Sequence, residues 1–332
     1  MIRPSESVKR SNVPRSRPAP AYETRRGRMY QGDCEVVLGE YPLTRRRGHV
    51  QLILTSPPFP LNRKKRYGNL TGDDYLAWLQ RLAPLFRDYL SPDGSIVIEL
   101  GNAWEPGSPT MSTLPMRALL GFLEAAELYL CQEFVCYNPA RLPSPAQWVT
   151  VERIRVKDAF TRVWWMAPTP RPKANNRKVL TRYSKSMQDL LERGTYNPGV
   201  RPSQHNIGER SFLSDNGGAI PPNVLIPEHA ADYLTEVLPI ANTASADAYQ
   251  KYCRDQRITP HPARMQERLA QFFIEFLTDE GDLVLDPFAG SNTTGAVAER
   301  LNRRWLSIEL QDVYVEASRA RFADFAGSGA NR

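Results

Sequence analysis

A short loop with two consecutive prolines is the first segment whose residue types and spacing suggest chemistry. Thr55-Ser56-Pro57-Pro58-Phe59 directly follows the apolar run Val50–Leu54. The prolines lock two φ angles and remove two backbone N–H donors, so the loop is rigid and rich in carbonyl acceptors. The Ser56 hydroxyl and the Pro57 carbonyl can accept hydrogen bonds from an exocyclic amino group, which pulls its nitrogen towards tetrahedral geometry. Phe59 can hold the attached ring by stacking, although a plain Pro-Pro turn with a core Phe explains the same residues.

A second loop, rich in small residues, predicts a cofactor site. Asp286-Pro287-Phe288-Ala289-Gly290-Ser291-Asn292-Thr293-Thr294-Gly295 follows the apolar run Leu283–Leu285 and opens a helix. Small residues let backbone N–H groups approach a ligand, and a helix N-terminus favours its carboxylate or phosphate. Glu309 ends another apolar run some 20 residues later, where an acid can accept both hydroxyls of a ribose. The loop is neither GxGxxG nor a Walker sequence, so it indicates a nucleoside cofactor; a Gly-bearing turn with a surface Glu is the alternative.

These loops must be positioned by a sheet, and the apolar runs predict one. Seven runs predict strands at 29–31, 50–55, 95–100, 132–137, 161–166, 283–286 and 305–309. Amphipathic segments predict helices at 73–89, 114–127 and 265–277, and another helix from Asn292. The alternation predicts an α/β fold with a Rossmann-like, doubly wound, mostly parallel seven-stranded sheet. Because ligands bind beyond the carboxyl ends of such strands, the two loops should hold a nucleoside cofactor and a base amine side by side.

The chain divides into a basic tail and one discontinuous domain. Residues 1–28 are rich in Pro, Ser and Arg without hydrophobic periodicity, which predicts a disordered tail. The α/β pattern occupies residues 29–168 and 260–325, and an irregular insert of residues 169–259 separates the two parts.

The distribution of charge favours a polyanionic partner. The chain has 43 Lys and Arg against 36 Asp and Glu, and residues 1–28 hold +6 of the net +7. Residues 41–66 and 139–188 are locally basic, which suits nucleic acid, although basic loops also serve solubility. The sequence has no apolar run long enough for a membrane span and no signal-like start, so we expect a cytoplasmic protein. The four Cys residues form no CxxC pair, which argues against a metal site.

Taken together, the two loops resemble those of the amino-group DNA methyltransferases in their permuted (β) motif order, from about Met29 to Phe322. In that family the catalytic loop comes first, then a target-recognition region, then the S-adenosylmethionine loop of a circularly permuted class I methyltransferase fold. Further matching segments are Tyr67-Gly68-Asn69, Leu142-Pro143-Ser144-Pro145, Arg155-Val156-Lys157-Asp158-Ala159, Asp215-Asn216-Gly217-Gly218 and His261-Pro262-Ala263-Arg264. Enzymes of this family that act on adenine usually carry Asp or Asn where this chain has Ser56. The resemblance therefore points to the N4-cytosine group and leaves an N6-adenine enzyme as the alternative.

The resemblance implies a site-specific methyltransferase that flips a cytosine out of duplex DNA and methylates its N4 amino group with S-adenosylmethionine. The implied catalytic residues are Ser56, Pro57, Pro58 and Phe59. The implied cofactor-binding residues are Asp33, Phe273, Asp286, Phe288, Gly290, Ser291, Asn292, Thr293, Thr294 and Glu309. Asp33 would accept from the adenine amine, but a helix N-cap explains it too. Phe273 is explained equally well as a core residue of an amphipathic helix.

Double-stranded DNA is the implied partner, and two groups of cations are candidates to bind it. Arg63, Lys64, Lys65 and Arg66 follow the catalytic loop, where solvated loop charge is the competing interpretation. The others, in the target-recognition region 169–259, are Arg171, Lys173, Arg177, Lys178, Arg182 and Arg201. The resemblance also implies a companion restriction endonuclease for the same site, and we expect a monomer. An inactive DNA-binding module of the same fold is disfavoured because Ser56, Gly290 and Glu309 are all intact.

Overall fold

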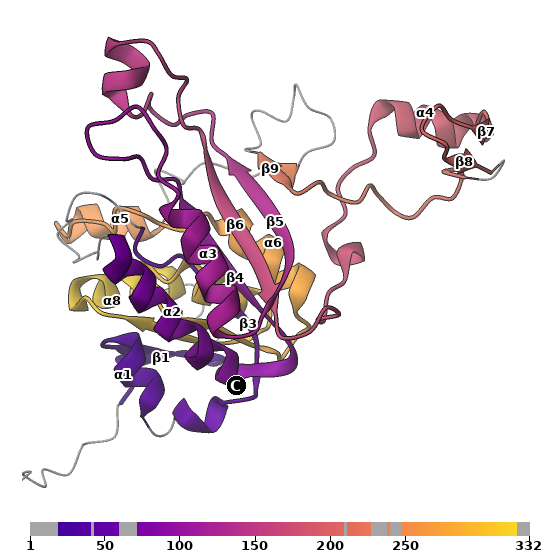
Figure 1. Cartoon of the computed structure of the whole chain (residues 1–332). Coiled ribbons are helices and arrows are strands. Elements are labelled where there is room, and N and C mark those ends of the chain that lie inside the picture. The colour runs from indigo at the N-terminus through magenta and orange to yellow at the C-terminus, as the bar shows by residue number, and fades with distance from the viewer. Residues whose placement is uncertain are drawn as a thin grey trace, which may run out of the picture.

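A mixed β-sheet forms the centre of the molecule (Figure 1). The structure is a computed structural model, which describes residues 19–40, 43–59, 72–208, 211–226, 238–239 and 248–323. The strands, in their order across the sheet, are β1 (Tyr22–Glu23), β2 (Gly27–Gln31), β12 (Arg304–Glu309), β11 (Leu283–Asp286), β3 (Val50–Thr55), β4 (Leu90–Gly101), β6 (Phe160–Ala167), β5 (Tyr129–Tyr137), β9 (Val224–Ile226) and β10 (Leu238–Pro239). From β2 to β4 every neighbour is parallel, whereas β6 is antiparallel to both β4 and β5.

All seven predicted strands lie in this sheet, so the predicted α/β class is confirmed. The short strands β1, β9 and β10 extend the sheet at its two edges and were not predicted. The N-terminal boundary predicted at residue 28 is wrong, because Tyr22 pairs with Met29 and is itself buried. The sequence did not reveal β1 because a strand of two residues is too short to show hydrophobic periodicity. Residues 1–18 of the predicted tail lie outside the described residues.

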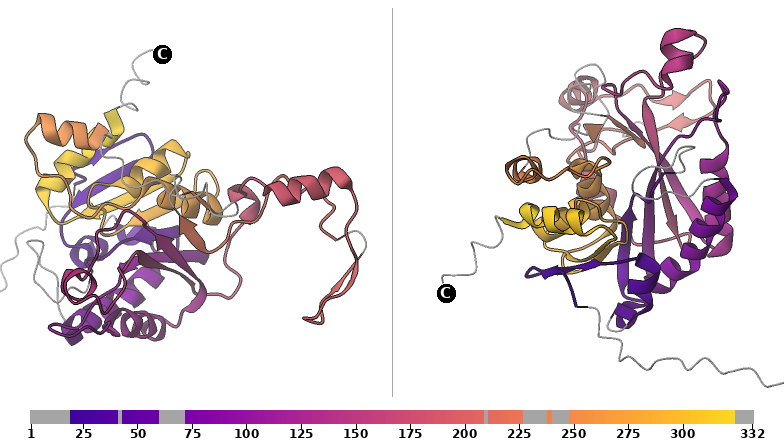
Figure 2. Two further views of the ribbon diagram at one scale, coloured as in Figure 1. Left: turned by 90° about the horizontal axis from the view of Figure 1, so that it is seen from above. Right: turned by 90° about the vertical axis from the view of Figure 1, so that its left-hand side faces the viewer.

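Helices cover both faces of the sheet, as the right-hand view of Figure 2 shows. On one face lie α1 (Cys34–Gly39), α2 (Gly72–Tyr89) and α3 (Leu114–Ala125); on the other lie α6 (Glu267–Leu277), α7 (Thr293–Arg300) and α8 (Asp312–Ser318). The strand β3 alternates between these layers, with Ile53 packing in the first core and Leu52 and Leu54 in the second. A strand buried on both faces carries an unbroken apolar run, which is why the sequence revealed it.

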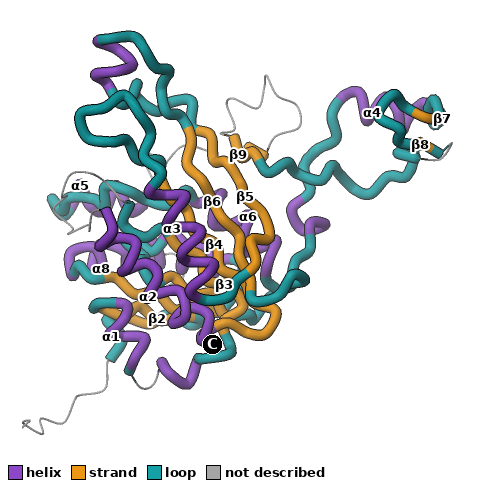
Figure 3. The backbone as a smooth tube through the Cα atoms, viewed as in Figure 1, coloured by secondary structure: helices purple, strands orange, loops and turns teal. Residues whose placement is uncertain are grey.

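The segment between β6 and α6 is mostly loop (Figure 3) and extends away from the sheet (Figure 1). It includes a 3₁₀ turn, η3 (Asn176–Val179), the helix α4 (Lys185–Arg193) and a small hairpin of β7 (Gly199–Val200) and β8 (Asn206–Ile207). The helix α5 (Ala248–Asp255) then leads back towards the sheet. None of the helices in the described ranges is long and apolar enough to cross a bilayer.

Candidate active site

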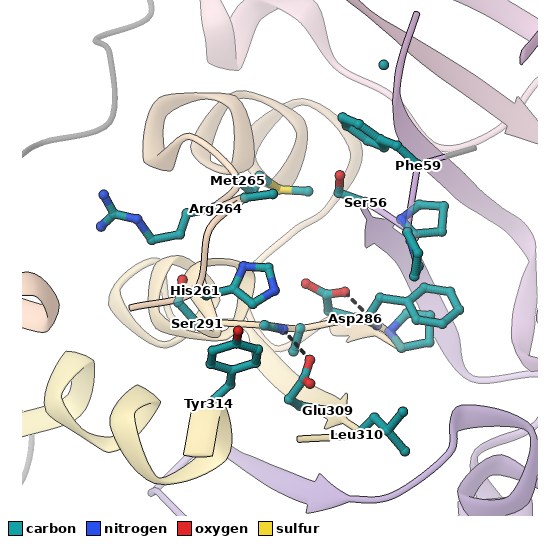
Figure 4. Close-up of a pocket in the computed structure, with 18 of the residues that line it drawn as sticks. Ser56, Phe59, His261, Arg264, Met265, Asp286, Ser291, Glu309, Leu310 and Tyr314 are labelled. Atoms are coloured by element: carbon teal, nitrogen blue, oxygen red, sulfur yellow. Dashed lines mark hydrogen bonds between the residues drawn. The ribbon is translucent and has the colours of Figure 1, made fainter. Parts of the chain in front are cut away.

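The two predicted loops meet at the carboxyl ends of adjacent strands. Thr55 ends β3, Asp286 ends β11, and the Thr55 Oγ1 donates a 2.7 Å hydrogen bond to Asp286 Oδ1 although 231 residues separate them. Both side chains are almost completely buried. Beyond this bond opens a cavity of about 890 Å³ that both loops line (Figure 4). A cavity of this size is typical of a cofactor site.

All four residues of the predicted catalytic loop lie on the wall of this cavity. The Ser56 hydroxyl lies 3.4 Å from the carbonyl oxygen of Glu99 in β4, and its oxygen faces the cavity in Figure 4. The Phe59 ring packs against Gly101, where a Cβ atom would lie only 2.7 Å from the ring. The glycine therefore lets Phe59 sit against the end of β4 beside Ser56. The arrangement places a hydroxyl and an aromatic face at one end of the cavity.

Gly290 and Glu309 form the opposite part of the cavity wall. Gly290 has a φ of +51°, and its N–H donates to Glu309 Oε2 at 2.9 Å. The other carboxylate oxygen accepts from the backbone N–H of Gln311 at 2.8 Å. A carboxylate has about four acceptor positions, so these two bonds leave capacity for the hydroxyls of a ligand. Burial raises the pKa of Glu309, and the backbone N–H donors oppose that effect.

Asp286 is the second buried carboxyl group in the wall. Burial raises the pKa of Asp286 to about 6, although the hydroxyls of Thr294 and Thr55 and the backbone N–H of Phe288 all stabilise its charged form. Since the group also accepts from Phe288 N–H at 3.1 Å, it holds the turn of the loop from within. Its hydrogen bonds to Thr55 and to the backbone of Phe288 stabilise the loop that carries Gly290.

The comparisons with known proteins agree with this geometry. Residues 50–320 match the family of N6 and N4 methyltransferases described as DNA methylase. The chain belongs to the DNA methylase family. The type II methyltransferase M.PvuII of Proteus hauseri is 43% identical over 307 residues, covering 92% of this chain and 86% of that relative. The sequence-based assignment to the amino-group DNA methyltransferases is therefore confirmed.

Solved structures place this methylase in the same fold. The PvuII DNA methyltransferase, described as cytosine-N4-specific, matches with a TM-score of 0.70 and 37% identity, covering 92% of this chain and 89% of that one. A DNA modification methylase of Thermus thermophilus, in complex with S-adenosylmethionine, matches with a TM-score of 0.51 and 17% identity over 92% and 99% of the two chains. The second likeness shows the shared fold.

Two of the predicted cofactor residues do not face the cavity of this methylase. Phe273 is completely buried and makes edge contacts with Phe134 and Phe272 in the core beneath α6. Asn292 is also completely buried, and its Oδ1 accepts from Ser307 Oγ at 2.7 Å and from a backbone N–H of α7. Both residues stabilise the fold behind the loop and are not part of the cavity wall, so a contact of either with the cofactor stays a prediction. The remaining predicted cofactor residues line the cavity: Asp33, Asp286, Phe288, Gly290, Ser291, Thr293, Thr294 and Glu309.

Asp33 lies where both interpretations of the sequence would place it. It lines the cavity, and its Oδ1 caps α1 by accepting from the N–H groups of Glu35 at 2.8 Å and Val36 at 3.4 Å. The cap holds the carboxylate in place at the end of β2. The interpretation as an N-cap is therefore confirmed, and a contact with the cofactor stays a prediction.

Two of the predicted DNA-binding cations are used elsewhere. Lys173 pairs with Asp279 at 2.6 Å and Asp282 at 2.7 Å, and Lys178 also pairs with Asp279. These acids precede β11, so both lysines lie at the amino end of the strand, opposite the cavity. Their contact with DNA stays a prediction, and nothing in this position favours it. The others in the insert, Arg171, Arg177, Arg182 and Arg201, are exposed or half-buried. Arg63, Lys64, Lys65 and Arg66 lie outside the described residues.

Sequence reasoning expected the helix from Met265 to wall the cofactor but gave no role to three other residues that close the cavity from this side, His261, Arg264 and Tyr314. His261, Arg264 and Met265 precede α6 and line the cavity together with Tyr314 of α8 (Figure 4). The rings of His261 and Tyr314 pack edge to face, with 4.6 Å between their centroids. His261 also lies close to Gly290, where a Cβ atom would be only 3.1 Å from the imidazole. The only sequence signal was the resemblance of the segment from His261 to Arg264, which carried no assigned chemistry.

The properties of His261 fit a cavity that receives a polar ligand. Burial lowers the pKa of His261 to about 4, so the ring is neutral at pH 7. Its Nδ1 is buried and has no hydrogen-bond partner among the residues that the structure describes. Buried polar atoms are normally paired, so an orphaned nitrogen at a cavity wall points to a ligand. Together with the bare backbone of Gly290 and the carboxylate of Glu309, it fits S-adenosylmethionine, whose ribose and methionine ends carry the matching polar groups.

Proposed function

We propose that this chain is a site-specific DNA methyltransferase that uses S-adenosylmethionine to methylate the N4 amino group of cytosine in duplex DNA. The observation that carries the proposal is the single cavity in which Ser56 and Pro57 lie opposite Gly290 and Glu309. The loop that would accept hydrogen bonds from an amine and the loop that would bind a nucleoside therefore line the same cavity. The relative that is 43% identical is a type II DNA methyltransferase, and its solved structure is described as cytosine-N4-specific.

S-adenosylmethionine, when bound, supplies an electrophilic methyl group on a sulfonium sulfur. Glu309 would accept from the ribose hydroxyls, and the backbone of Gly290 leaves room for the cofactor to approach. Ser56 and Pro57 would accept from the two hydrogens of the cytosine amine, which exposes the nitrogen lone pair. No side chain would form a covalent bond: the cytosine nitrogen would gain the methyl group as its bond to the sulfonium sulfur breaks, S-adenosylhomocysteine would be released, and the amine would lose a proton to solvent.

The target base must leave the duplex to reach this cavity, because its amino group takes part in a base pair. Flipping costs a few kcal/mol. Phe59, seated on Gly101, offers a ring face for the extruded base and offsets part of that cost. Arg182, which is exposed, and Arg201, which is half-buried, lie farther along the insert and would contact the flanking duplex.

The main alternative is transfer to N6 of adenine in the same cavity, since the family includes both activities. Ser56, rather than Asp or Asn, favours cytosine, as does the relative described above. We further propose that the chain acts as a monomer in the cytoplasm and protects DNA from a companion restriction endonuclease of the same specificity.

The test is to incubate the purified chain with unmethylated duplex DNA and methyl-labelled S-adenosylmethionine, then identify labelled nucleosides by chromatography and mass spectrometry. N4-methylcytosine is the expected product, and sequencing the modified DNA would give the target site. N6-methyladenine would overturn the choice of base. Label in neither base would overturn the proposed activity.

A matched pair of variants tests the role of the loop. Ser56→Ala should lower kcat by about two orders of magnitude, the cost typical of losing a hydrogen bond that strengthens in the transition state. Its affinity for S-adenosylmethionine should stay unchanged in a calorimetric titration. Ser108→Ala, in an exposed turn after β4, is the control and should leave both values unchanged.

A further inference from the structure

The loop of residues 138–159, which we call the β5–β6 loop, stands at the mouth of the cavity. It connects β5 to β6 beyond the carboxyl end of β5 and projects at the top of Figure 1. The short π-helix η2 (Gln147–Val151) forms the middle of the loop. Four of its residues line the cavity: Arg141, Leu142, Ser144 and Asp158. It lies before the insert that the sequence assigned to target recognition, and nothing in the proposed chemistry uses it.

Hydrogen bonds hold the β5–β6 loop in one shape. Asn138 N–H donates to the carbonyl of Ala159 at 2.7 Å, and Asp158 N–H donates to the carbonyl of Ser144 at 3.0 Å. Asn102, which follows β4, donates from its Nδ2 to Asp158 Oδ1 at 2.9 Å. The base of the loop is therefore tied to the cavity wall.

The upper part of the β5–β6 loop is tied as well. Arg155 Nε donates at 2.9 Å to the carbonyl of Pro109, which belongs to a neighbouring loop. The backbone N–H groups of Ile154 and Arg155 both donate to the carbonyl of Trp148. Since the loop is ordered by its own bonds, its exposed side chains are presented in a preformed arrangement.

This rigid loop exposes aliphatic side chains to solvent. Val156 is 87% exposed and Leu142 is 81% exposed, and Val151 and Ile154 are also exposed. Single exposed aliphatic residues are common, but four of them on one ordered loop whose base lines the cavity suggest an interaction site. Leu142 both lines the cavity and faces solvent, so it lies at the rim through which a base would pass.

The chemistry of the loop matches duplex DNA. In the segment from Arg153 to Lys157, the cations Arg153, Arg155 and Lys157 alternate with Ile154 and Val156. Arg155 and Lys157 also donate hydrogen bonds to the backbone carbonyls of Pro109 and Pro139, but these neutral partners leave their positive charge to attract phosphates. Aliphatic side chains can enter a base stack and fill space between bases. Because duplex DNA is the proposed substrate of the adjoining cavity, it is the partner that this combination of cations and aliphatic side chains fits.

We propose that the β5–β6 loop is a wedge that enters the duplex beside the target base, with Leu142 and Val156 occupying the space that the flipped base leaves. The inference rests on the proposed methyltransfer to a flipped cytosine. It assigns to this loop a contribution to opening the duplex, separate from base recognition by the insert and from the chemistry at Ser56.

The test compares two duplexes that carry the target site, once the sequencing experiment proposed above has identified it. In one the target cytosine is paired with guanine, and in the other it lies opposite an abasic site, where no base pair has to be broken. The variant is the double substitution Leu142→Ala with Val156→Ala. Leu120→Ala, 66% exposed on α3 away from the cavity, is the control.

The double variant should methylate the paired duplex at least about tenfold more slowly than wild type, as expected when buried aliphatic contacts are truncated. On the abasic duplex its rate should come within about twofold of wild type, and its affinity for S-adenosylmethionine should be unchanged. Because both side chains are exposed, their truncation should not move the unfolding midpoint. Leu120→Ala should behave as wild type on both duplexes.

Two results would overturn the inference alone: an unchanged rate on the paired duplex, or an equal loss on both duplexes, which would indicate a structural role. If the wild-type chain methylated neither duplex, the proposed function would fail and the inference with it.

Discussion

The hydroxyl of Tyr22 accepts a 2.9 Å hydrogen bond from Nδ2 of Asn292 and thereby joins the first strand of the sheet to the start of helix α7. The same hydroxyl lies 2.6 Å from Ser318 Oγ in α8. Asn292 has a left-handed φ of +55°, and its Oδ1 accepts from Ser307 Oγ. This buried network holds the residue that caps α7, directly after Gly290 and Ser291 on the cavity wall.

Replacing Tyr22 by Phe should therefore weaken both the fold and the cofactor site. The variant keeps the ring but leaves the buried amide of Asn292 without this acceptor, which should lower the free energy of unfolding by about 1–3 kcal/mol. We expect the dissociation constant for S-adenosylmethionine to rise several-fold, because the loop beside Asn292 loses its support. Urea unfolding and calorimetric titration measure the two effects. Tyr129→Phe, at an exposed ring, is the control; equal behaviour of the two variants would contradict the role of the network.

The bond between Thr55 and Asp286 predicts a second variant. Thr55→Val keeps the shape of a completely buried side chain but removes the hydroxyl donor from a buried carboxylate. The free energy of unfolding should fall by about 1–3 kcal/mol. The pKa of Asp286 should also rise further above its usual value, since this hydroxyl stabilises the charged form.

The control for Thr55→Val is Thr110→Val. Thr110 is exposed, and among the described contacts its hydroxyl forms a hydrogen bond only with the nearby Ser108. Denaturant unfolding at pH 7 checks the difference between the two. A Thr55→Val protein as stable as the control would show that this bond does not hold the two loops together.

Glu309→Gln tests the proposed ribose contact. Both carboxylate oxygens accept backbone N–H groups, from Gly290 and Gln311, so an amide at this position would present an NH₂ group to one of those donors. We expect the affinity for S-adenosylmethionine to fall at least about tenfold, which corresponds to about 1.4 kcal/mol. Glu316→Gln, exposed on α8, is the matched control. Calorimetric titration that gave the same affinity for Glu309→Gln and wild type would remove Glu309 from the cofactor site.

The residues that the sequence placed correctly share a local signal. A strand buried on both faces appears as an apolar run, and the residue that ends it lies at the carboxyl edge of the sheet. Thr55, Asp286 and Glu309 each end such a strand, and the loops after β3 and β11 follow directly. The position of these side chains at one edge therefore follows from the strands alone.

The surroundings that the sequence did not reveal depend on contacts between distant segments. Helical periodicity gave Phe273 a buried face but could not show that Phe134 and Phe272, rather than a cofactor, cover it. Lys173 was one of many basic residues in a loop, and its pairing with Asp279 and Asp282 joins segments more than a hundred residues apart. Such a pairing carries no spacing that the sequence could reveal.

His261 was missed for the same reason, because it enters the cavity from the end of the insert. A lone His after an irregular segment has no periodicity, and its partners, Gly290 and Tyr314, belong to other elements. Its chemistry appeared only when the fold placed the ring over the glycine of the cofactor loop.

The lowered pKa of His261 predicts how stability depends on pH. Burial holds the folded-state pKa at about 4, whereas an unfolded chain has a His pKa of about 6.5. Between these values the unfolded state binds the proton more readily, so this group destabilises the folded protein as the pH falls from about 6.5 towards 4. Asp286 acts in the opposite direction, because its raised pKa lets the folded state take up a proton first as the pH falls below about 6.

His261→Gln isolates the contribution of the imidazole. The Gln side chain does not titrate, so the variant should lose about 1–2 kcal/mol less free energy of unfolding than wild type between pH 7 and pH 5. Urea unfolding at the two pH values, without cofactor, gives the comparison, and Asp286 contributes equally to both proteins. His49→Gln, at an exposed residue, is the control for the change of residue type. If wild type and His261→Gln lost the same stability on acidification, His261 would not be the buried neutral group that closes the cavity.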